Sequence, residues 1–133
     1  MSIYQALVDR LQTVDGISRI QKTNEAMIQP KANESWVRPT LLRAESTGRT
    51  KGVNGYLMQK GLLRIDLFTT KGTGEADQLS QAIRNAFPER GDGSQIAVGT
   101  NFLSVLNAWV ENGREDGAQY LTPIFVRWQM PER

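Results

Sequence analysis

The side chains that perform most protein catalysis are either missing from this chain or isolated in it. Its 133 residues include no cysteine and no histidine, which removes thiolate nucleophiles, Cys- and His-based metal sites and the commonest general base. Serine and threonine are plentiful, but no histidine can activate them. Every lysine lies in a polar stretch, where it is not the buried base that a Ser-Lys pair needs. We therefore expect a protein that is not an enzyme and that has no cofactor and no metal site.

Three local patterns invite a chemical interpretation, and each has a simpler one. Glu115-Asp116 pairs two carboxylates in a glycine-flanked turn that we expect to be solvated. Gly72-Thr73-Gly74 precedes a helix, whose amino terminus attracts anions, but it lacks the Walker and GxGxxG spacings, so we interpret it as a cap with Thr73 as the capping residue. Asp66 lies beside Arg64, where we expect a cross-strand ion pair or a surface position rather than a general acid.

Two helices are predicted from apolar residues at helical spacing. Ser2 caps the first, which runs from Ile3 to Val14 and ends at Asp15-Gly16. The second starts after Thr73 and ends at Phe87, because Pro88 disfavours helical dihedrals in the residue before it. Strand-like patterns cover 36–42, 56–68, 95–98, 100–111 and 120–130, with a possible short strand at 27–28.

These elements predict one domain, residues 1–133, of the α+β class. We expect a mostly antiparallel sheet of four to six strands with both helices packed on one face. Leu63, Ile65 and Leu67 should form the core face of one strand. Pro39 predicts a sheet edge or a bulge, and Gly61 a bulge or a close backbone approach. Three tryptophans, Trp36, Trp109 and Trp128, fall on strands, and core packing or an interface remains open for each.

Compartment and charge narrow the possible partners. No apolar run approaches the ~18 residues of a membrane span, and the first ten residues lack a signal-peptide pattern, so we expect a cytoplasmic protein that does not bind membranes.

The net charge of +2 is too small for a general nucleic-acid binder. Residues 36–64 carry six basic side chains against Glu45 alone, a net +5, which leaves −3 for the remainder. Such asymmetry suits a head-to-tail ring, although scattered charges on a solvated loop are an equal alternative.

The order of segments resembles the tail terminator proteins of long-tailed bacteriophages, a family of minor tail or tail-completion proteins. The likeness is carried by Arg-Ala-Glu-Ser-Thr at 43–47, Gly-Leu-Leu-Arg-Ile-Asp-Leu-Phe at 61–68 and Thr-Pro-Ile-Phe-Val at 122–126. It begins with the amino-terminal helix, is clearest from Val37 through Pro88 and resumes from Gly117 to Trp128.

This resemblance implies a structural protein of the phage or prophage virion tail, assembled in the bacterial host cytoplasm. Such proteins form a hexameric ring that caps the tail tube, stops its polymerisation and presents the head–tail joining surface. The implied partners are further copies of the chain, the tail tube protein and a head-completion or connector protein. DNA passes through such a ring without specific recognition. We place the partner or subunit interface at five basic residues: Arg43, Arg49, Lys51, Lys60 and Arg64.

Two other functions remain open at this stage. A small dimeric α+β module could bind a ligand or peptide, which would require an apolar pocket with convergent polar groups. Another structural protein of the tail tube or neck would share the assembly role and differ only in its place.

The polar loop Arg43–Asn54 generates a first prediction. Its glycines and polar residues bury little apolar area to offset the entropy of ordering, so it should be among the least ordered segments of the isolated protein. Amide hydrogen exchange of the free subunit measures this directly. Strong protection throughout the loop would contradict a segment that orders only on contact with a partner.

Overall fold

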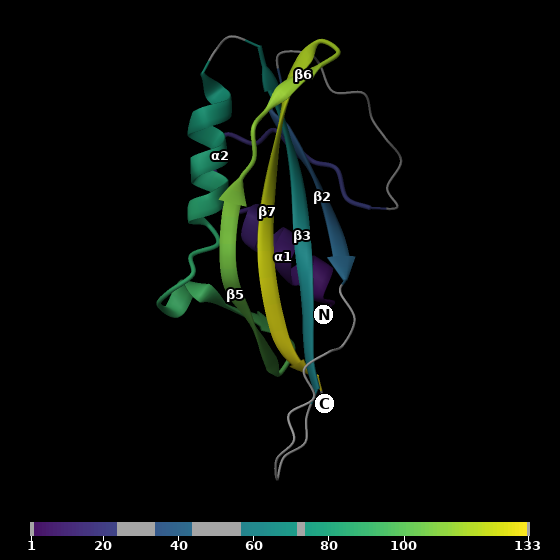
Figure 1. Cartoon of the computed structure of the whole chain (residues 1–133), viewed down its shortest axis with the longest axis vertical. Coiled ribbons are helices and arrows are strands. Elements are labelled where there is room, and N and C mark those ends of the chain that lie inside the picture. The colour runs from purple at the N-terminus through teal and green to yellow at the C-terminus, as the bar shows by residue number, and fades with distance from the viewer. Residues whose placement is uncertain (1, 24–33, 44–56, 72–73, 133) are drawn as a thin grey trace.

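The computed structural model describes residues 2–23, 34–43, 57–71 and 74–132, and the remaining residues are drawn as a thin grey trace in Figure 1. In these ranges the chain has two α-helices, one short 3₁₀-helix and seven strands. In chain order they are α1 (Ile3–Leu11), β1 (Arg19–Ile20), β2 (Trp36–Arg43), β3 (Leu57–Thr70), α2 (Glu75–Asn85), η1 (Asp92–Ser94), β4 (Gln95–Val98), β5 (Asn101–Val110), β6 (Arg114–Asp116) and β7 (Gln119–Glu132).

All seven strands belong to one mixed, curled sheet. Its order is β1-β2-β3-β7-β5-β4, with β6 paired to β7 beside this path. Only β1 and β2 are parallel. At the centre, β3 and β7 pair over 14 residues each, from Leu57 opposite Glu132 to Thr70 opposite Gln119. The predicted α+β class is confirmed, whereas the prediction of a mostly antiparallel four- to six-stranded sheet missed the parallel strand β1, which makes the sheet mixed, and the short strand β6.

Both helices begin near the predicted positions, with differences at their ends. The Ser2 hydroxyl accepts a hydrogen bond from the Gln5 amide at 3.0 Å, which confirms the predicted cap of α1. This helix ends at Leu11 rather than Val14, because the chain tightens into a turn in which Gly16 adopts φ 92°. Gly74, with φ 75°, occupies the N-cap position of α2 and provides no side-chain cap, and Thr73 lies outside the described residues.

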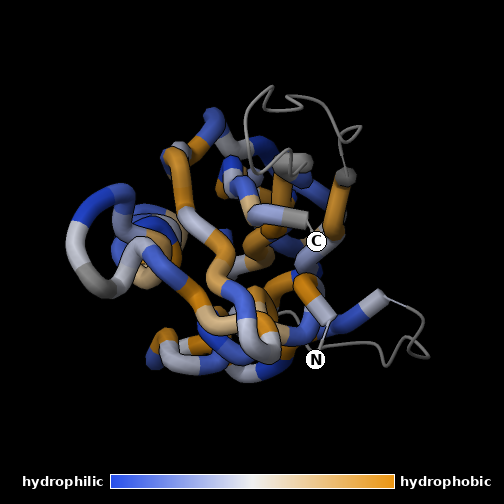
Figure 2. Tube along the Cα trace, turned by 90° about the horizontal axis from the view of Figure 1, so that it is seen from below, coloured by the Kyte–Doolittle hydropathy of each residue, from blue (hydrophilic) through white to orange (hydrophobic). Residues whose placement is uncertain are grey.

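The core lies between the helices and one face of the sheet. In the end-on view of Figure 2, hydrophobic and hydrophilic residues alternate along the strands. As predicted, Leu63, Ile65 and Leu67 are fully buried. From the helices, the same cluster includes Ile3, Leu7, Leu11 and Ile83, and Phe87 joins it just after the end of α2. We call this side of the sheet the inner face.

Gly61 marks a close approach of backbone and ring. A Cβ atom at this position would lie 2.3 Å from the Trp128 ring, which is itself fully buried. Gly61 pairs with Arg43 on one side and Trp128 on the other without a register shift. The structure therefore selects the close approach over the bulge, and only glycine leaves room for the indole against β3.

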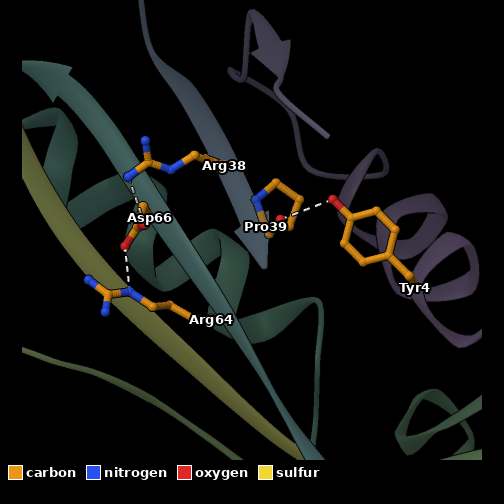
Figure 3. A network of polar contacts seen from close by, with 5 residues as sticks. All are labelled: Tyr4, Arg38, Pro39, Arg64 and Asp66. Carbon is orange, nitrogen blue, oxygen red and sulfur yellow. Dashed lines mark hydrogen bonds and ion pairs between the residues drawn. The ribbon is translucent and has the colours of Figure 1, made fainter. Parts of the chain in front are cut away.

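Pro39 lies on a part of β2 that no other described strand covers. β1 pairs only with Trp36 and Val37, so no described strand pairs with this edge of β2 beyond that point. Proline has no amide donor to leave unpaired there. The Pro39 carbonyl accepts a hydrogen bond from the Tyr4 hydroxyl at 2.9 Å, which joins α1 to this edge (Figure 3). The predicted edge position is confirmed, and the contact blocks part of the edge against further strand pairing.

The core assignment predicts a large effect of one truncation. Ile83→Ala should lower the free energy of unfolding by about 2–5 kcal/mol, because Ile83 is fully buried against the sheet and its truncation leaves a cavity. Urea denaturation measures the change. Gln81→Ala, at an exposed position of the same helix, is the matched control and should shift stability by less than about 0.5 kcal/mol. Equal effects of the two substitutions would contradict the packing of α2 on the sheet.

Candidate functional site

The side of the sheet that faces away from the helices carries an organised group of cationic and aromatic side chains. We call it the outer face, and in Figure 1 it is turned toward the viewer with α1 behind it. Strand alternation places its residues opposite the inner-face core. The members used below are Trp36, Arg38, Thr40, Lys60, Arg64, Asp66, Phe68, Trp109, Phe125 and Arg127.

Asp66 is the polar centre of the outer face. Only 4% of the residue is exposed, and its two carboxylate oxygens accept hydrogen bonds from different arginines. Arg38 Nη2 donates to Oδ2 at 3.2 Å from the neighbouring strand, and Arg64 Nε donates to Oδ1 at 2.8 Å from the same strand (Figure 3). Of the two positions predicted for Asp66, the structure shows the cross-strand ion pair, with Arg38, rather than a surface position. One buried carboxylate thus holds two half-exposed guanidinium groups across β2 and β3.

Each of these arginines also covers an aromatic ring. The Arg38 guanidinium carbon lies 5.3 Å from the centre of the Phe68 ring, and that of Arg64 lies 5.8 Å from the Phe125 ring. Such distances allow cation–π attraction. The arginines are therefore oriented by a carboxylate on one side and by aromatic faces on the other, which restricts the rotamers of otherwise flexible side chains.

The array continues across β7 to β5. The rings of Trp109 and Phe125 stack with centroids 5.4 Å apart, and Arg127 covers Trp109 at 5.4 Å. Arg64, Phe125 and Trp109 are direct register partners on three neighbouring strands. A continuous row therefore crosses the sheet from β3 to β5, in which two stacked rings lie between the cations Arg64 and Arg127.

A β-bulge brings Trp109 into this row. Val105 pairs with Trp128, while Asn107 pairs with Arg127, so the register shifts by one residue at Leu106. Val105 is buried in the core, and strict alternation from it would turn position 109 inward. The extra residue reverses the side on which the following residues emerge. Trp109 consequently lies on the outer face, whereas Trp128 is in the core.

The third tryptophan, Trp36, lies on the same face at the start of β2. Trp36 stacks on Phe68 with centroids 4.1 Å apart and an interplanar angle of 8°, and both are buried with Leu121. The indole NH donates to Gln119 Oε1 at 2.9 Å, and the Gln119 amide donates in turn to the Glu34 carbonyl at 2.7 Å. This small cluster anchors the start of β2 to β3 and β7.

Exposed apolar side chains flank the cationic row. Leu42 is 46% exposed, Phe102 is 55% exposed and Leu106 is 36% exposed. Leu42 lies on β2, and the other two lie on β5 opposite its core residues. Together with the arginines and rings, they give the face the composition of a protein contact surface.

The five basic residues predicted from the sequence are only partly placed by the structure. Lys60 and Arg64 lie on the outer face of β3, and the side chain of Lys60 is exposed. Arg43 is the last residue of β2, and its side chain is outside the described part of the structure. Arg49 and Lys51 lie outside the described residues. The sequence interpretation missed Arg38, Arg127 and their rings, although the alternation of β7 already set Phe125 and Arg127 apart from the core residues.

The surface hollows offer little of what a small-molecule site needs. A hollow of about 390 Å³ lies beside the end of α2, lined by Arg84, Asn85, Phe87, Pro88, Glu89, Arg90 and Ala108. Three of these seven residues are charged and one is an amide, whereas ligand pockets are mostly apolar with a few polar groups. Within the described ranges, no three acidic side chains converge as metal ligands. No described helix has the length and hydrophobicity to cross a bilayer.

Comparison with known families gives a match over nearly the whole chain. The model of a family described as phage tail terminator protein matches residues 2–128. The chain belongs to the phage tail terminator family. As a member, it has a structural role in a phage tail, and the resemblance drawn from the sequence is confirmed. A comparison with curated proteins found no match.

Solved structures share the fold of this family member at low sequence identity. One has a TM-score of 0.70 at 14% identity, and the match covers 99% of this chain and 99% of the other. Another belongs to the virion of a native gene transfer agent particle, with a TM-score of 0.66 at 12% identity and coverage of 98% and 96%. The fold therefore recurs in proteins with very different sequences.

The geometry around Asp66 predicts a difference between two charge-removing substitutions. Asp66→Asn should lower the free energy of unfolding by about 1–3 kcal/mol, because a buried carboxylate that accepts from two arginines loses its charge. Glu115→Gln is the control, since Glu115 is 75% exposed and 3.6 Å from Lys71, and exposed pairs contribute little. Urea denaturation of both variants is the measurement. An Asp66→Asn variant as stable as Glu115→Gln would contradict the central role of this carboxylate.

Proposed function

We propose that this chain caps the tail tube, stops its polymerisation and forms the head–tail joining surface as a ring of six copies. The observation that carries the proposal is the family match over residues 2–128. Assembly takes place in the cytoplasm of the bacterial host, and the whole chain, residues 1–133, acts as one domain. Its partners are neighbouring copies, the tail tube protein and a head-completion or connector protein, with DNA passing through the ring.

A terminator must present two unlike surfaces. One has to bind the end of the tube. The other has to bind the head and must not bind a further tube subunit. A heterologous, head-to-tail contact that closes by rotation limits growth to a ring. The polarised charge of the sequence, +5 over residues 36–64 and −3 elsewhere, is compatible with such a contact.

The outer face supports an assembly role because its chemistry is that of contact surfaces. Arginine and aromatic residues are enriched at the centres of protein interfaces. Arg38 and Arg64 are held in place by Asp66 and by aromatic rings, so little side-chain entropy remains to be lost on binding. We place the partner-binding surface at Lys60 and Arg64 together with Arg43, Arg49 and Lys51 of the adjoining segment.

Tail assembly with Arg49→Glu and Lys51→Glu combined tests the basic segment. The double variant should fold, but its tails should exceed their normal length or fail to join heads, because reversed charges repel the docking partner. Electron microscopy of tails and counts of joined particles are the measurements. Lys22→Glu combined with Arg90→Glu makes the same change in net charge outside this segment and should assemble normally.

Two outcomes would count against different parts of the proposal. Normal tails and normal head joining from the Arg49/Lys51 variant would remove this segment from the mechanism. Absence of the chain from purified tails would remove the terminator function itself.

A further inference from the structure

The end of the molecule opposite the exposed ends of β3 and β7 is acidic. Residues 70–71 and 74–77 lie there beside residues 111–120, because Thr70 pairs with Gln119, and Lys71 approaches Glu115. They carry five carboxylates against two cations, Lys71 and Arg114. The carboxylates belong to Glu75, Asp77, Glu111, Glu115 and Asp116. We call this the acidic end.

The acidic end has a defined backbone structure. β6 and its turn lie at the top of Figure 1 beside the end of β3, where Asp116 and Thr70 both pair with Gln119. Pairing of Arg114–Asp116 with residues 119–121 of β7 holds the two adjacent carboxylates on a strand rather than on a free tail. Gly117, with φ 61°, makes the tight turn that lets β6 fold back on β7. Asp116 is exposed, and Glu115 is 75% exposed.

The outer face has the opposite charge. It carries Arg38, Lys60, Arg64 and Arg127 against the single carboxylate of Asp66. That carboxylate is buried and already shared by two arginines, so the exposed potential of the face is positive. No described helix covers this side.

We propose that the outer face of one subunit binds the acidic end of a second copy of this chain. We infer a second copy as the binding partner from charge complementarity, since one molecule carries both surfaces and no ion pair joins their described residues. The two surfaces are different, so the contact is heterologous and repeats head to tail. This inference rests on the proposed function only in taking the second copy to be the neighbour in the ring.

The contact has a defined chemistry. The carboxylates of β6 meet guanidinium groups whose remaining N–H donors are free to point outward, because Asp66 engages one donor nitrogen of each arginine. Exposed Leu42 and Leu106 flank this row and exclude water from its rim. Ionic strength should therefore weaken the association, since part of the attraction acts between partly solvated charges.

Disulfide trapping tests this geometry cleanly because the chain has no cysteine of its own. Thr40→Cys introduces one thiol on the outer face beside Arg64, and Ala118→Cys introduces one in the turn of the acidic end. The two single variants are mixed at high concentration and oxidised. A mixed dimer should form at least ~tenfold above the homodimer of either variant, because only face and end meet in a heterologous contact. Asp9→Cys, exposed on α1, is the matched control partner and should give background cross-linking with Thr40→Cys.

Charge reversal adds a second readout. Arg127→Glu alone and Asp116→Arg alone should each weaken self-association by ~tenfold or more, and their combination in one chain should recover part of the loss. Sedimentation at low salt measures the dissociation constant. Weakening without recovery would contradict a direct pairing of the two regions.

The same trap applied to purified tails separates this inference from the proposed function. The chain could be present in tails while no disulfide forms between Thr40→Cys and Ala118→Cys, either in tails or in free protein. That result overturns the face-to-end contact and leaves the terminator function standing. A cross-link in free protein with the chain absent from tails supports the contact and overturns the function. Binding of duplex DNA that is lost in Arg64→Glu, with no cross-link, would assign the outer face to nucleic acid and overturn the proposal.

Discussion

The structure depends on the unbroken antiparallel pairing of β3 with β7. Fourteen residues of each strand are in register, so every second residue of both strands falls on the same side. Leu63, Ile65, Ile124 and Val126 thereby form the floor of the core. A slip of one residue would turn this apolar set to solvent and bring the cationic residues of the outer face against the helices. Burial of the core and exposure of the outer face are thus consequences of one constraint.

The same strands form an apolar core on one face of the sheet and an array of charged and aromatic side chains on the other. On the inner face, glycine at position 61 admits the Trp128 ring, and helix side chains complete an apolar core. On the outer face, a buried carboxylate would be costly alone, but Asp66 is compensated by Arg38 and Arg64. The same arginines remain half exposed and lie over rings. A surface that is organised before any partner arrives loses less entropy on binding, which suits a subunit whose task is a specific contact.

Much of this could be predicted from the sequence, because it follows from local patterns. Alternation around Ile65 identified both sides of β3, the Ser2 cap identified the start of α1, and the order of motifs identified the family. The rest depends on long-range pairing. The two-residue strand β1 has too little pattern to be recognised, and the Leu106 bulge, which decides that Trp109 faces outward, is visible only in the pairing of β5 with β7. The joining of Arg64, Phe125 and Trp109 in one row requires that pairing as well.

The proposed ring of neighbouring copies, which closes the tail tube, is best tested by electron cryomicroscopy of intact tails. Such images show where the chain lies, how many copies are present and which surfaces meet. The expected result is one ring of six copies at the head-proximal end, with the outer face of each subunit against the acidic end of the next. The chain repeated along the tube, or density for a different protein at that end, would contradict it.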